Sequence, residues 1–120
     1  HKIFQRTHEE EAALAKALAT SFLAATGLPA YLYSIGRPAK RLGPALWARN
    51  LLANRLYQCP VLFFEPYVMN NKEVYQRIQE GDYEGMREVA GSIRKSIYRE
   101  YRDAILAGLT TYYGSQRTPH

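Results

Sequence analysis

The sequence predicts an α/β fold in which helices flank a partial sheet, either mixed or parallel. Two observations lead to this prediction. Apolar residues recur at helical spacing near both ends of the chain, and short apolar runs bounded by Gly, Pro or Asn lie between the helical regions. In chain order the predicted elements alternate between strand and helix, which is typical of a sheet with at least one parallel crossover.

The first helix is predicted for residues 7–27. Thr7 and Glu10 have the spacing of a capping box, and Gly27 stands where a C-cap glycine is expected. The apolar residues between these caps repeat every four positions and form one stripe along the helix, made of Leu14, Leu18 and Phe22. The segment therefore predicts an amphipathic helix that covers one face of a core.

Three strands are predicted, at residues 2–5, 30–35 and 60–64. Residues 36–45 are rich in Gly, Pro and basic side chains and predict a loop, whereas residues 46–58 fit a helix or a strand. The run at 60–64 is apolar at every position, as expected of a strand covered on both faces. Three strands cannot surround such a strand, so we expect the chain to be the C-terminal part of a larger three-layer α/β domain.

The C-terminal half predicts two further helices. Asn70 or Asn71 can cap a short helix that runs to about Gln79, and residues 80–85 interrupt it. The last helix is predicted for residues 86–111, because apolar residues lie at steps of four along it, namely Val89, Ile93, Ile97, Tyr101 and Ile105. Basic residues occupy much of the remaining surface of this helix.

Composition limits the classes of function. Hydrophobic residues make up 47% of the 120 residues, which excludes a disordered chain, and no apolar run reaches the roughly 18 residues of a membrane span. Sixteen Lys and Arg residues against eleven Asp and Glu give a net charge of +5. This charge suits an anionic partner such as nucleic acid, acidic lipid or a cell-wall polymer, although basic side chains often serve solubility alone.

The acidic residue Glu65 directly follows the apolar run. In open α/β sheets, binding sites form at the carboxyl ends of strands. A carboxylate at that position, beside Phe64 and Tyr67, would be partly desolvated and prepared as a general base near neutral pH. A structural ion pair with Arg49 or Arg55 explains the same residue equally well, so both interpretations stay open.

Residues 59–78, CPVLFFEPYVMNNKEVYQRI, resemble the closing segment of the zinc-dependent N-acetylmuramoyl-L-alanine amidases of the bacterial cell wall. That segment contains a proline, apolar residues, a glutamate, and then an asparagine before an acidic helix start. These features are matched by Pro60, Glu65, Asn71 and Glu73. The helix ahead of the strands and the final helix also resemble the family. Family members often have glycine just after the glutamate, so a different turn is expected at Pro66.

The resemblance implies a hydrolase that cleaves the amide between N-acetylmuramic acid and L-alanine in peptidoglycan. Glu65 would be its catalytic general base, and the basic loop residues Arg37, Lys40 and Arg41 would face anionic groups of the glycan or the stem peptide. Residues 1–120 would then form a single, incomplete catalytic domain. The resemblance also implies a periplasmic, extracellular or cell-wall location.

The resemblance implies a zinc cofactor as well, held in the family by two histidines and a glutamate upstream of this segment. The histidines here are His1, His8 and His120, and none has the spacing of a metal-binding pair. We therefore expect the zinc ligands outside this chain, on the missing N-terminal portion of the same domain. Without them the chain is not expected to be active alone.

Two alternatives to an enzyme remain open. Ten tyrosines and the basic last helix would permit a nucleic-acid-binding module, although acidic residues interrupt the basic ones and no nucleic-acid-binding motif is present. The chain could also be a non-catalytic partner subunit whose apolar strand is completed by another polypeptide. The single cysteine, Cys59, fits a small buried hydrophobic residue better than a nucleophile.

Overall fold

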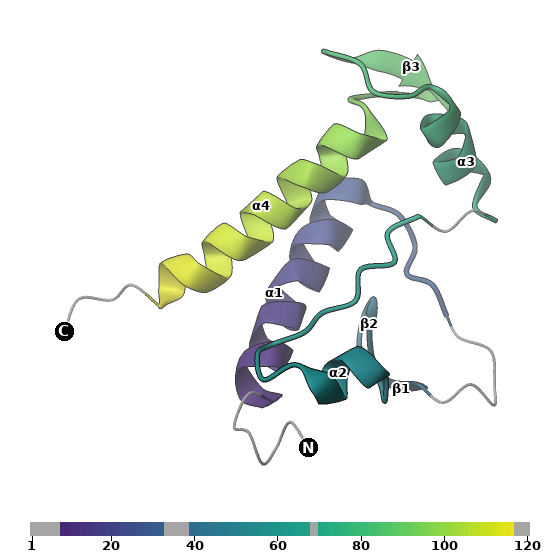
Figure 1. The fold of residues 1–120 in the computed structure, drawn as a ribbon. Coiled ribbons are helices and arrows are strands. Elements are labelled where there is room, and N and C mark those ends of the chain that lie inside the picture. Colours follow the sequence, from purple (N-terminus) through teal and green to yellow (C-terminus); the bar gives the residue numbers. More distant parts are fainter. Residues whose placement is uncertain (1–7, 33–38, 68–69, 117–120) are drawn as a thin grey trace.

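The computed structural model describes residues 8–32, 39–67 and 70–116, and two long helices dominate it (Figure 1). In chain order the elements are α1 (His8–Thr26), β1 (Ala39–Gly43), β2 (Leu46–Arg49), α2 (Leu52–Leu56), α3 (Lys72–Gln79), β3 (Arg87–Val89), β4 (Ser92–Arg94) and α4 (Ile97–Ser115). In Figure 1, α3 and the β3–β4 pair lie near the end of α1 and the start of α4, whereas α2 and the β1–β2 pair lie lower in the view. The described chain is thus a mixture of helices and short strands.

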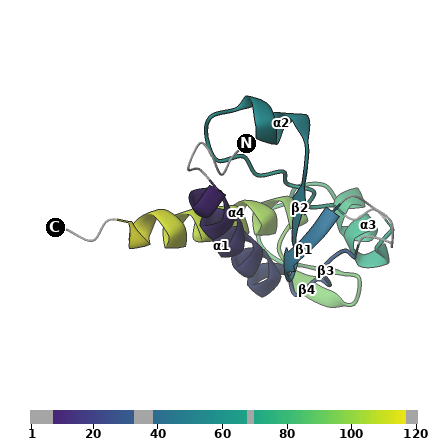
Figure 2. The ribbon, with the colours of Figure 1, turned by 90° about the horizontal axis from the view of Figure 1, so that it is seen from below.

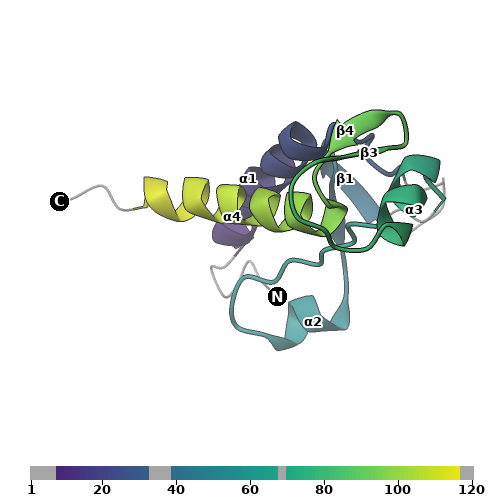
Figure 3. The ribbon, with the colours of Figure 1, turned by 90° about the horizontal axis from the view of Figure 1, so that it is seen from above.

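The main packing contact joins α1 to α4, which lie side by side in Figures 1 and 3. The Ser21 hydroxyl on α1 donates a hydrogen bond of 2.7 Å to the Ala104 carbonyl on α4. Leu14 and Leu18 of the predicted stripe are buried on α1, and Ala104 is 1% exposed on α4. The first helix is therefore confirmed over its described part, together with the face that it buries.

Close approach of the two helices depends on Gly108 of α4. A Cβ at this position would lie 2.8 Å from Leu18 Cδ2 and 3.0 Å from Leu18 Cα, closer than packed carbon atoms normally come. Gly108→Ala is therefore expected to lower the free energy of unfolding by about 1–2 kcal/mol, because overpacking outweighs the gain of about 1 kcal/mol in helix propensity. Urea denaturation followed by circular dichroism measures this change.

Gly114 on the same helix is the matched control for that substitution. A Cβ there meets no atom within 4 Å, so Gly114→Ala should leave stability unchanged or raise it slightly. Equal effects of the two substitutions would contradict the importance of the close approach at Gly108.

A second core joins α3 to α4. Val74 of α3 and Ile97 and Tyr101 of α4 are buried, and partly buried apolar side chains pack against them, from Phe22, Leu28 and Ile78. The Asn71 side chain caps α3, since its Oδ1 accepts a hydrogen bond of 3.1 Å from the Val74 amide. This confirms the predicted short helix and the predicted cap, and it fixes the direction in which the preceding segment reaches α3.

Four charged residues form a cluster at the junction of α1, α3, β4 and α4, named here the Arg77 cluster: Glu73, Arg77, Arg94 and Glu100. Arg77 is 1% exposed and its Nη1 lies 3.0 Å from Glu100 Oε1. Arg94 Nη2 lies 3.1 Å from Glu100 Oε2 and donates a hydrogen bond of 2.7 Å to the Thr26 carbonyl at the end of α1. One buried carboxylate thus links two guanidinium groups from different parts of the chain.

The sheet prediction was wrong in its pairing and position. The described strands form two separate two-stranded antiparallel sheets, β1 with β2 and β3 with β4, and no parallel pair occurs among the described residues. Residues 30–32 and 60–67 have no regular secondary structure, whereas β1 lies in the predicted loop. Residues 2–5 and 33–35 lie outside the described part of the chain. A strand needs a partner for its backbone groups, and local apolar character cannot supply one.

The ambiguous segment 46–58 contains both alternatives, because β2 is followed by the short helix α2. Figures 2 and 3 show α2 projecting from one edge of the structure, away from the two long helices. None of the helices in the described ranges is long and apolar enough to cross a membrane.

The last helix begins later than predicted, at Ile97, because a β-hairpin occupies residues 87–94. Ala90 and Gly91 form its turn with φ angles of 53° and 83°. Positive φ at both central residues gives the backbone twist that suits a two-residue hairpin. Val89 and Ile93, whose spacing continued the helical pattern, therefore lie in strands β3 and β4.

Candidate functional site

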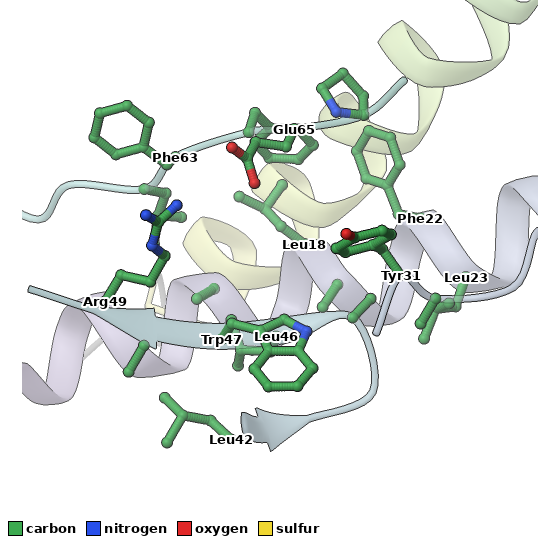
Figure 4. Close-up of a pocket in the computed structure, with 18 of the residues that line it drawn as sticks. Leu18, Phe22, Leu23, Tyr31, Leu42, Leu46, Trp47, Arg49, Phe63 and Glu65 are labelled. Atoms are coloured by element: carbon green, nitrogen blue, oxygen red, sulfur yellow. The ribbon is translucent and has the colours of Figure 1, made fainter. Parts of the chain in front are cut away.

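A large open hollow lies between α1, the β1–β2 hairpin and the segment 60–67. Its volume is about 1490 Å³, and apolar side chains form much of its wall (Figure 4). Several are well exposed, including Leu32 at 61%, Leu42 at 50% and Phe63 at 61%. Sites for small molecules usually have volumes of about 300–1,000 Å³, so this space suits an extended polymer or an added polypeptide segment better.

Glu65 lies on the wall of this hollow, and Figure 4 shows its carboxylate directed into the open space. The residue is exposed and belongs to an irregular segment. The predicted position at the end of a buried strand was therefore wrong, and so was the expected desolvation of the carboxylate. The structure nevertheless places this acid on the wall of a large hollow.

Contacts from both long helices hold the segment that carries Glu65. On one side of the glutamate, the Phe64 ring packs against Phe22 of α1 with a centroid distance of 4.8 Å. On the other side, the Tyr101 hydroxyl of α4 donates a hydrogen bond of 2.8 Å to the Pro66 carbonyl. No local pattern marks Phe22 or Tyr101 as neighbours of this site, because both are distant from it along the chain.

The start of the same segment is attached to α1 and α2 through polar contacts. The Val61 amide donates a hydrogen bond of 2.9 Å to Glu11 Oε2, and Asn54 Nδ2 donates one of 3.3 Å to the Val61 carbonyl. These bonds satisfy the backbone polar groups of Val61, which belongs to no strand, with side chains from other elements.

Arg49 of β2 lines the hollow together with Glu65, and Figure 4 shows its side chain extending toward the segment around Phe63. Of the two arginines named as ion-pair partners, Arg49 is therefore near the candidate site, whereas the Arg55 side chain lies outside the described part of the structure. In this position the Arg49 guanidinium can pair with the Glu65 carboxylate or face an anionic ligand in the hollow.

The predicted substrate-binding residues are not brought to the hollow in the described structure. Arg41 lies exposed in β1, its Nε donates to the Gly43 carbonyl at 3.5 Å, and neither it nor Lys40 is among the residues that line the hollow. Arg37 lies outside the described residues. Arg41 therefore stands on an exposed strand of the hairpin, not on a loop around Glu65.

The described residues do not fit a zinc site by themselves. Among residues 8–32, 39–67 and 70–116, no group of three or more His, Cys, Asp or Glu side chains is arranged to hold a metal ion. His8 lines the hollow at the start of α1, and His1 and His120 lie outside the described ranges. Cys59, expected to be buried, is exposed instead.

Burial alters the titration of Tyr101 beside the site. Desolvation raises the pKa of its hydroxyl from 10.0 to about 12, so it remains a hydrogen-bond donor to Pro66 well into the alkaline range. Burial also raises the pKa of Tyr67, helped by the nearby Tyr98. Both tyrosines are therefore neutral at physiological pH.

The raised pKa of Tyr101 makes stability depend on pH in a definite window. Because the folded-state pKa of about 12 exceeds the unfolded value of 10.0, the contribution is complete below pH 10 and is lost as pH rises through 12. Between pH 10 and pH 12, we expect the free energy of unfolding to fall in both the native protein and Tyr101→Phe. The fall should be larger in the native protein, by on the order of 2 kcal/mol. Urea titrations at several alkaline pH values test this, and parallel curves would contradict it.

Comparison of the chain with protein-family models, curated proteins and solved structures found no match in any of the three. The candidate function therefore depends on the residues themselves and on the geometry around Glu65.

Proposed function

We propose that the chain is part of the catalytic domain of a zinc-dependent N-acetylmuramoyl-L-alanine amidase, with Glu65 as its general base. One observation carries the proposal: the Glu65 carboxylate points into a hollow of about 1490 Å³ from a segment anchored to two helices. Of the residues that resemble the amidase motif, Pro60 and Glu65 belong to this segment, and Asn71 caps α3.

The proposed chemistry of Glu65 is proton transfer during amide hydrolysis. A water oxygen attacks the carbonyl carbon of the muramic-acid lactyl group while Glu65 accepts a proton from that water. The carboxylic acid then gives the proton to the nitrogen of L-alanine as the carbon–nitrogen bond breaks. A general acid–base of this kind contributes about 10²–10⁴-fold to the rate. The exposed position of Glu65 leaves it accessible to a polymeric substrate.

The zinc ligands of the proposed enzyme would come from a polypeptide segment outside residues 1–120. The same segment would cover the apolar wall of the hollow. Leu32, Leu42 and Phe63 are exposed together on this wall, and gathered apolar side chains of this kind usually mark a surface that another segment or partner covers. Since the substrate is peptidoglycan, the proposed place of action is the periplasm or the cell wall.

The distribution of charge favours this proposal over a nucleic-acid-binding module. The basic residues of the predicted last helix pair with nearby carboxylates. Arg94 contacts Glu73 and Glu100, and the other pairs are Arg87 with Glu80, Lys95 with Asp103, Arg99 with Asp82 and Arg102 with Asp103. In nucleic-acid binding, Lys and Arg side chains replace the counterions condensed on the phosphates, and these side chains already have protein partners.

The direct test is hydrolysis of purified muropeptides by the complete domain, with Glu65 or glutamine at this position. Release of the free L-alanine amine, detected by mass spectrometry, reports cleavage of the proposed bond. Absence of any cleavage by the zinc-loaded complete domain would overturn the proposal.

A further inference from the structure

The segment that carries Glu65 needs a source of rigidity other than a sheet. Residues 60–67 belong to no strand in the described structure, and yet a general base must be held within about 0.5 Å of its productive position. Because the side chain of Glu65 is exposed, the way in which the neighbouring backbone is held contributes to the direction of the carboxylate.

Tyr101 restrains that backbone directly. Its side chain is 5% exposed and belongs to the long helix α4, so its own position is well fixed. Its hydroxyl reaches across 35 positions of sequence to the carbonyl of Pro66, the residue that directly follows Glu65, at 2.8 Å. The hydrogen bond therefore acts one residue away from the candidate catalytic group.

Ring contacts of Tyr101 support the same segment. The Tyr67 ring stacks on it with a centroid distance of 5.0 Å and an angle of 13°. The edge contact with Phe22, at 5.2 Å and 70°, links Tyr101 to the ring that supports Phe64. Along the chain, Glu65 thus lies between Phe64, which packs on Phe22, and Tyr67, which stacks on Tyr101. The rings of Phe22 and Tyr101 also contact each other.

We propose that Tyr101 is a positioning residue, whose hydroxyl holds the Pro66 carbonyl so that the Glu65 carboxylate stays directed into the hollow. The inference rests on the proposed function of Glu65 and adds a residue that neither the motif nor its spacing indicates. Tyr101 itself does not touch the reacting atoms. Its removal should therefore lower the rate of the chemical step and leave substrate affinity nearly unchanged.

The test is Tyr101→Phe in the complete domain, because phenylalanine keeps the ring contacts and removes only the hydroxyl. We expect kcat to fall about 10–100-fold with KM changed little, since a misplacement near 1 Å costs up to about 10²-fold. Amide hydrogen exchange at Glu65 and Tyr67 should become faster in the same variant. This second readout does not depend on activity.

Tyr83→Phe is the matched control. The Tyr83 hydroxyl donates a hydrogen bond of 2.9 Å to the Arg94 carbonyl, and the residue is 6% exposed, so the variant loses an equally buried bond of the same kind. It belongs to the loop before the β3–β4 hairpin, and its hydroxyl bonds to Arg94 and not to the segment that carries Glu65. Tyr83→Phe should therefore keep both kcat and the exchange rate at Glu65 that the native protein has.

The outcomes separate this inference from the proposed function. A selective loss of kcat with faster exchange in Tyr101→Phe, absent from Tyr83→Phe, supports it. Normal kcat in Tyr101→Phe beside an inactive Glu65→Gln overturns the positioning role alone, whatever the exchange rates show. Full turnover by Glu65→Gln overturns the proposed function, and the inference with it.

Discussion

Replacing Glu65 by glutamine in the complete domain is expected to reduce the turnover of muropeptides at least ~100-fold, the lower range for loss of a general acid–base. Glutamine keeps the size and the hydrogen-bonding capacity of the side chain but cannot accept the proton of the attacking water. Because Glu65 is exposed and the contacts that hold its segment come from Phe64, Pro66 and Tyr67, folding should be unaffected. Initial rates of L-alanine amine release measure the effect.

Glu84→Gln provides the control for this substitution. The Glu84 side chain is 90% exposed in the loop before the β3–β4 hairpin, so the same chemical change there should leave turnover as it was. Zinc content, measured by elemental analysis, should be the same in both variants and in the native domain, since Glu65 is not proposed as a metal ligand. Near-normal hydrolysis by Glu65→Gln would remove this residue from the mechanism.

Glu100→Gln is expected to lower the free energy of unfolding by about 3–5 kcal/mol, the usual range for removing one partner of a buried ion pair. Glu100 is the carboxylate that both Arg77 and Arg94 contact, at 3.0 and 3.1 Å. Without its charge, the 1% exposed guanidinium of Arg77 keeps its hydrogen bond to the Lys95 carbonyl and the more distant carboxylate of Glu73, at 3.7 Å. Urea denaturation followed by circular dichroism gives the change in stability.

Two further variants show whether the buried charge is the cause. Asp82→Asn breaks an ion pair of similar length, 2.9 Å to Arg99 Nε, but at the surface, where solvent screening should make the loss small. Combining Glu100→Gln with Arg77→Met removes both buried charges, so the double variant should be less destabilised than the sum of the single variants. Equal losses from Glu100→Gln and Asp82→Asn would contradict a special role of the Arg77 cluster.

The sequence by itself determined the helices whose signals are local. The stripe of α1, its C-terminal Gly27 with φ of 61°, and the Asn71 cap of α3 were all predicted correctly, because caps and apolar periodicity depend on residues within one or two turns. The same local signal misled at Val89 and Ile93. Their spacing fits a helix, but the turn at Ala90 and Gly91 places them in two antiparallel strands.

The strands and their pairing were decided by the tertiary structure. An apolar run such as residues 60–64 predicts that its side chains are buried, but it does not show whether they pack against a neighbouring strand or against a helix. In the described chain Phe64 packs on Phe22 of α1, and the backbone of this run lies outside any sheet. β1 formed instead where Gly, Pro and basic residues predicted a loop, and it pairs with β2 from the segment that fitted a helix or a strand.

At the candidate site, the sequence determined which residue to examine, and the tertiary structure decided what surrounds it. The motif around Glu65 marks a carboxylate after an apolar run, which is a local property. The hollow into which it points, the Arg49 side chain on the same wall and the bond from Tyr101 to Pro66 join segments far apart in the chain. No local pattern records such contacts, because they exist only after α1 and α4 have packed against each other.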